Sequence, residues 1–92
     1  MNVTLKITDV ICNNCFKNSM QKEVVVTSST QTIDLQLGYT LNVIDFNENS
    51  STVLIQNGTN SYIRIIYEFE TQLILNSNNK TKHVLLLSSI TN

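Results

Sequence analysis

The sequence predicts a single all-β domain spanning residues 1–92, a small antiparallel β-sandwich or flattened β-barrel of seven to eight short strands. Apolar and polar residues alternate along much of the chain, as they do in half-buried strands. Alanine is absent while Thr, Val and Ile are abundant, a composition that suits a pleated surface. Turn signals rich in Asn and Ser recur about every ten residues, which is typical of sandwiches and small barrels.

The alternation places the strands in order along the chain. We expect them at residues 3–8 with an extension to 11, and then at 23–27, 32–37, 39–46, 53–55, 61–75 and 84–87. The polar Asp9 interrupts the first pattern and predicts a bulge or a strand end, and a change of phase at Val43 and Ile44 predicts a second bulge. Asn57-Gly58 is the strongest hairpin signal, because both residues tolerate positive φ. Residues 12–22 predict a loop or one to two helical turns, and residues 88–92 a tail.

The stretch from Ser61 to Leu75 has the clearest two-faced pattern, and we expect it to be the central strand of the core. The predicted inner row, which should be the best buried in the fold, contains Ile63, Ile65, Tyr67 and Phe69. The predicted outer row combines Tyr, Arg and Ile, a composition that resembles that of protein interfaces. The candidate interaction surface is therefore Tyr62, Arg64, Ile66, Glu68 and Glu70.

Charge and hydropathy exclude several classes of function. The net charge is −1 and 14% of residues are charged, so there is no basic stripe for nucleic acid. No segment reaches the ~18 apolar residues of a membrane span, and the first residues do not resemble a signal peptide. We therefore expect a cytoplasmic protein, or a virion-associated one. The bias toward Asn, Ile, Lys and Thr indicates an AT-rich genome, such as that of a low-GC bacterium or a phage.

One pair of cysteines has the spacing of a metal or redox site. Cys12 and Cys15 are separated by two asparagines, so both sulfurs could bind one zinc ion, with His83 as a third ligand. A disulfide or redox pair is a second interpretation. Two reduced, partly buried cysteines are the favoured one, because a second cysteine pair is absent. His83, the single histidine, is expected at the surface near a turn, and no catalytic set is evident.

The sequence therefore favours a non-enzymatic protein-interaction or assembly module without a cofactor. It could be a structural subunit of a phage or bacterium, or an inhibitor that binds a host protein. The partner is then another protein or a second copy in a homo-oligomer, because an all-β chain with few charges is more soluble when part of its surface is covered. The alternative is a small zinc-binding or redox module that uses Cys12 and Cys15.

Overall fold

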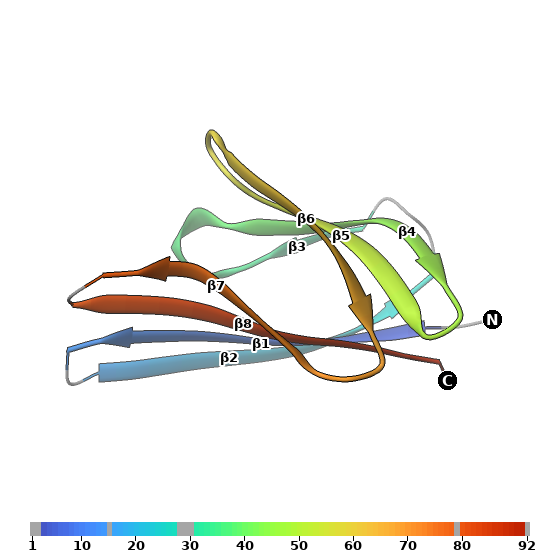
Figure 1. Ribbon diagram of the computed structural model, residues 1–92, viewed down its shortest axis with the longest axis horizontal. Helices are drawn as coiled ribbons and strands as arrows, with labels where there is room; N and C mark the ends of the chain where they lie inside the picture. The colour runs from blue at the N-terminus through green and yellow to red at the C-terminus, as the bar shows by residue number, and fades with distance from the viewer. Residues whose placement is uncertain (1–2, 15, 28–30, 79, 92) are drawn as a thin grey trace.

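The computed structural model describes residues 3–14, 16–27, 31–78 and 80–91, which form two four-stranded antiparallel sheets (Figure 1). The strands are β1 (Val3–Asn13), β2 (Phe16–Val26), β3 (Thr32–Asp34), β4 (Thr40–Asn47), β5 (Ser50–Asn57), β6 (Asn60–Tyr67), β7 (Thr71–Ser77) and β8 (Thr81–Thr91). A 3₁₀ turn, η1 (Gln36–Gly38), precedes β4. Sheet A has the order β2-β1-β8-β7, and sheet B has the order β3-β4-β5-β6.

The two sheets share one apolar core. Sheet A contributes side chains from β1 and β8, such as Leu5 and Leu87, and sheet B contributes side chains from β4 and β5, such as Leu41 and Ile55. The all-β prediction is therefore confirmed. The flattened barrel is wrong, because no described strand of one sheet pairs with a strand of the other. Among the described residues, no helix is long and apolar enough to cross a membrane.

The β1–β2 hairpin differs from the prediction at residues 12–22. β1 continues without a register shift past Asp9 to Asn13, and β2 pairs with it from Phe16 to Val26. The predicted bulge at Asp9 and the predicted loop or helical turns are therefore wrong. Residues 16–22 form a strand without alternating apolar residues because β2 lies at the edge of sheet A, where most of its side chains stay in water.

Three further predictions can be compared with the structure: one bulge and two strand ends. The bulge predicted at Val43 and Ile44 is confirmed by a shift in the β4–β5 register between Val43 and Asp45. The strand predicted over residues 32–37 is only partly correct, because β3 ends at Asp34 and the chain then turns through η1. The predicted tail is wrong over residues 88–91, because β8 stays paired with β1 as far as Thr91.

The predicted hairpin forms, but its two-residue turn is Gly58-Thr59, because Asn57 is the last residue of β5 and pairs with Asn60. This turn supports a stability prediction. Gly58 has φ +58°, and a Cβ atom built on it would meet no atom within 4 Å. Gly58→Ala should therefore lower the free energy of unfolding by about 1 kcal/mol through backbone strain alone. Urea denaturation measures this loss. Gly58→Asn is the control and should lose less, since Asn tolerates positive φ better than Ala, and equal losses would contradict the explanation.

Candidate functional site

The orientation of β6 is opposite to the predicted one. Ile66 is 1% exposed and lies in the core, and Tyr62 packs against the core from the same row. Ile63 and Ile65 of the predicted inner row are more than half exposed. The prediction that the row of Ile63 is the best buried in the fold is therefore wrong.

The neighbouring strand explains this orientation. In the antiparallel register, β5 places Ser51 opposite Ile66 and Val53 opposite Arg64, and both β5 residues are fully buried. Directly opposite residues of paired strands point to the same face of a sheet. The row of Ile66 must therefore face the core, although the other row of β6 is the more apolar.

The opposite face of β6 presents a continuous apolar row to solvent. Ile63, Ile65 and Tyr67 have exposed fractions of 59%, 51% and 55%, and we call these three side chains the β6 outer row. Phe69, in the bend that follows, is 77% exposed. Single exposed apolar residues are ordinary, but a contiguous apolar surface marks a contact site.

β6 is also an edge strand, and it is the least protected of the four sheet edges. β3 has only three residues, and β7 is interrupted by a bulge between Ile74 and Asn76. β2 is long, but its outer row is mostly polar: Lys17, Ser19, Gln21, Glu23 and Val25. Short strands, bulges and charged side chains are the usual protections against edge-to-edge pairing. β6 has one such protection, the exposed Arg64.

The hairpin register shows which backbone groups of β6 face away from β5. Asn57 and Asn60 flank a two-residue turn, so they form a hydrogen-bonded pair. Hydrogen-bonded and non-bonded pairs alternate along an antiparallel ladder. Consequently Tyr62, Arg64 and Ile66 bond to β5, while the β6 outer row directs its N–H and C=O groups toward the open edge. The β5–β6 hairpin also projects from the body of the fold (Figure 1).

The polar members of the predicted interaction surface lie around this edge. Arg64 donates from Nη1 to the backbone oxygen of Ile63 at 2.9 Å, and its guanidinium lies 6.0 Å from the centre of the Tyr62 ring. Glu68 and Glu70 are exposed in the bend after β6. Ile66 is excluded from any surface by its burial, whereas a contact role for the exposed members stays a prediction.

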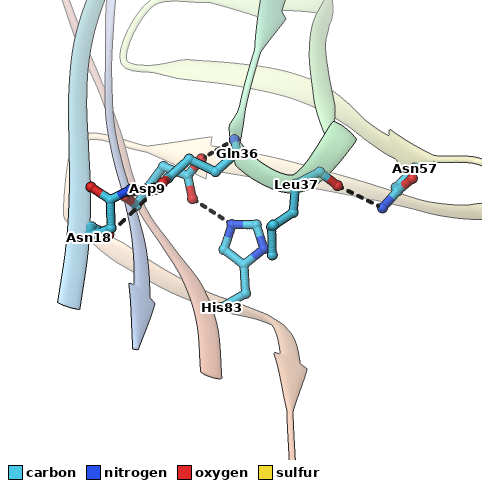
Figure 2. Close-up of polar contacts among 6 residues, drawn as sticks. All are labelled: Asp9, Asn18, Gln36, Leu37, Asn57 and His83. Atoms are coloured by element: carbon cyan, nitrogen blue, oxygen red, sulfur yellow. Dashed lines mark hydrogen bonds and ion pairs between the residues drawn. The ribbon is translucent and has the colours of Figure 1, made fainter. Parts of the chain in front are cut away.

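A second cluster, inside the fold, is centred on two buried polar side chains. His83 Nε2 and Asp9 Oδ1 are 2.5 Å apart, and both residues are 0% exposed. The backbone N–H of Gln36 donates to Asp9 Oδ2 at 2.6 Å, and the Gln36 side chain donates to the Asp9 carbonyl at 2.8 Å. Figure 2 shows the Asp9 carboxylate between His83 and Gln36. Asp9 and His83 belong to sheet A, and Gln36 belongs to η1, which joins β3 to β4 of sheet B, so these bonds connect the two sheets.

This cluster has the features of a structural contact, and we call the bonded side chains of Asp9 and His83 the Asp9–His83 clamp. The prediction that His83 lies at the surface is wrong, because β8 points it into the core on the same face as Leu85. Tyr39 packs its ring edgewise on the imidazole, with centroids 5.2 Å apart. His83 Nδ1 is buried without a hydrogen-bond partner among the described residues, so no nucleophile is bonded to it there. Within the part of the chain that the structure describes, the arrangement resembles the base half of a catalytic triad without a reacting group.

The predicted zinc ligands are not brought together in the described part of the chain. Cys12 is opposite Lys82 on β8, whereas His83 is opposite Ile11. Adjacent positions on a strand point to opposite faces, so Cys12 lies on the outer face of sheet A and His83 on the core face. Cys15 lies outside the described residues. Among those that are described, no group of three or more His, Cys, Asp or Glu side chains could hold a metal ion.

Comparison with known proteins identifies no relative: no family model, curated protein or solved structure matches this chain. The features of this chain that bear on its function are therefore the geometry of β6 and of the Asp9–His83 clamp.

Proposed function

We propose that this chain is a non-enzymatic protein-interaction module, built as an open β-sandwich, that binds an extended strand of a second polypeptide chain along β6. The observation that carries the proposal is the β6 outer row, three exposed apolar side chains on an edge strand, whose backbone N–H and C=O groups face the open edge of sheet B. In strand addition, main-chain hydrogen bonds supply affinity and pockets or rows of alternate side chains supply specificity. A cytoplasmic or virion-associated location stays a prediction.

The geometry of β6 and of the Asp9–His83 pair favours a binding function over a catalytic one. A binding surface needs an accessible apolar area with polar groups that a partner can satisfy, and β6 has both. A catalytic site needs a reachable acid, base or nucleophile. The Asp9–His83 pair is fully buried, and its carboxylate is already bonded to the backbone of Gln36.

The proposal can be tested with a panel of extended peptides of about eight residues that alternate apolar and polar side chains. Peptides that add to the edge should shift the backbone amide resonances of Ser61, Ile63, Ile65 and Tyr67 in NMR titrations. Ile65→Lys should weaken this binding at least tenfold, because the ammonium would be desolvated in an apolar row.

Ile74→Lys is the matched control. Ile74 is 50% exposed, against 51% for Ile65, and it also lies on the outer face of an edge strand, β7. The control should bind the peptides as the unsubstituted chain does. If no peptide perturbs the β6 amides, or if both lysine variants lose binding equally, the proposed function is wrong.

A further inference from the structure

We propose that the strand bound at the β6 edge is β6 of a second copy of this chain, antiparallel to the first about a two-fold axis at Ile65. This inference rests on the proposed function and names its partner. A two-fold interface uses the same patch on both copies, so the patch must be complementary to itself. An edge strand paired antiparallel with its own copy meets this requirement, because each free N–H faces the other copy's C=O.

The side chains of β6 distinguish between two possible registers. A two-fold axis at Arg64 would place the two Arg64 side chains directly opposite each other and Ser61 opposite Tyr67. Like charges directly opposite are destabilising. An axis at Ile65 instead places Ile65 opposite its own copy and Ile63 opposite Tyr67. Every member of the β6 outer row then faces an apolar partner, and one pair is aromatic with β-branched, a favourable combination.

The available area predicts a weak, reversible dimer. With exposed fractions between 51% and 59%, each side chain of the β6 outer row presents on the order of 100 Å². Even with the strand backbone, the interface stays below the ~800 Å² per partner of a standard complex. Arg64 also has to release the Ile63 carbonyl, which the partner strand would need. We expect a dissociation constant on the order of 100 µM, in the range of transient contacts.

Sedimentation velocity over a concentration series tests self-association of the full chain. The weight-average sedimentation coefficient should rise toward that of a dimer as concentration increases. Ile65→Lys should raise the dissociation constant at least tenfold, since it places two ammonium groups face to face on the axis. Ile74→Lys, matched in residue type and exposure, should leave the constant unchanged. A chain that stays monomeric at about ten times the expected constant overturns the inference.

Disulfide trapping tests the register. In a background with Cys12 and Cys15 replaced by serine, Ile65→Cys should form a covalent dimer under mild oxidation. The two Cα atoms of a hydrogen-bonded antiparallel pair lie about 5.5 Å apart, within the range that a disulfide spans. Ile63→Cys should not cross-link, because its opposite residue is Tyr67. Efficient cross-linking through Arg64→Cys, with none through Ile65→Cys, would overturn the proposed axis.

The two proposals fail in different ways. A monomeric chain whose β6 amides respond to the peptide panel refutes the second copy and retains strand binding at this edge. A dimer that survives Ile65→Lys, together with no peptide response, refutes both, because association would then use another surface.

Discussion

Asp9→Ala is expected to lower the free energy of unfolding by about 3–5 kcal/mol, a large effect for a single polar substitution. The change would leave two buried donors without an acceptor, His83 Nε2 and the backbone N–H of Gln36. Domains of this size are stable by roughly 5–14 kcal/mol, so the variant would lose a large share of its stability. Urea denaturation followed by far-UV circular dichroism measures the difference.

Two further variants distinguish the loss of the buried Asp9–His83 contact from the general effect of removing an aspartate. Asp45→Ala removes an exposed carboxylate whose one hydrogen bond among the described residues comes from the backbone N–H of Phe46, and should cost about 0.5 kcal/mol or less. The double variant Asp9→Leu with His83→Phe replaces the pair by apolar groups and should recover most of the loss, since well-packed apolar replacements of buried ion pairs are often neutral. An Asp9→Ala loss below about 1 kcal/mol would show that the clamp is not needed.

Ile66→Ala is expected to lower the free energy of unfolding by about 2–5 kcal/mol, as is usual when a buried isoleucine is truncated. Ile66 is 1% exposed and its opposite residue on β5, Ser51, is fully buried and bonded to Ser89 of sheet A at 2.8 Å. The cavity would therefore open between the two sheets, beside a polar contact that joins them. Thermal and urea denaturation should both report the loss.

Ile65→Ala is the matched control on the same strand. Its side chain is 51% exposed on the opposite face, so the loss should stay near 0.5 kcal/mol at concentrations where the chain is monomeric. Equal losses at Ile65 and Ile66 would contradict the orientation of β6. A larger loss at Ile65 would restore the orientation that the sequence alone predicts.

The Asp9–His83 clamp could not be recognised from the alternation of apolar and polar residues. Asp9 continues the row of Leu5 and Ile7, and His83 continues that of Leu85 and Leu87, so both were in phase with core residues in the sequence. A polar residue at a core-facing position of the pattern can indicate either the end of a strand or a buried side chain that is bonded to another polar group. Only the β1–β8 pairing, which brings together residues 74 positions apart, shows that these two bury each other's polar atoms.

What the sequence by itself determined is the local character of the chain. Alternation, β-branched composition and Asn-rich turns are local properties, and they specified an all-β fold, the Asn57-Gly58 hairpin and the bulge near Val43. Alternation also divided β6 correctly into two rows. It could not choose which row faces the core, because a period of two is unchanged when the strand is turned over.

The tertiary structure decided the rest through long-range pairing. The buried face of β5 turned Ile66 inward and left Ile63, Ile65 and Tyr67 in solvent. The position of β2 at a sheet edge allowed a polar stretch to form a strand, since the paired β1 supplies its hydrogen bonds and only part of its surface must be buried. The more apolar row of β6 thus became the candidate binding surface, because strand neighbours rather than the hydrophobicity of a row decide which face is covered.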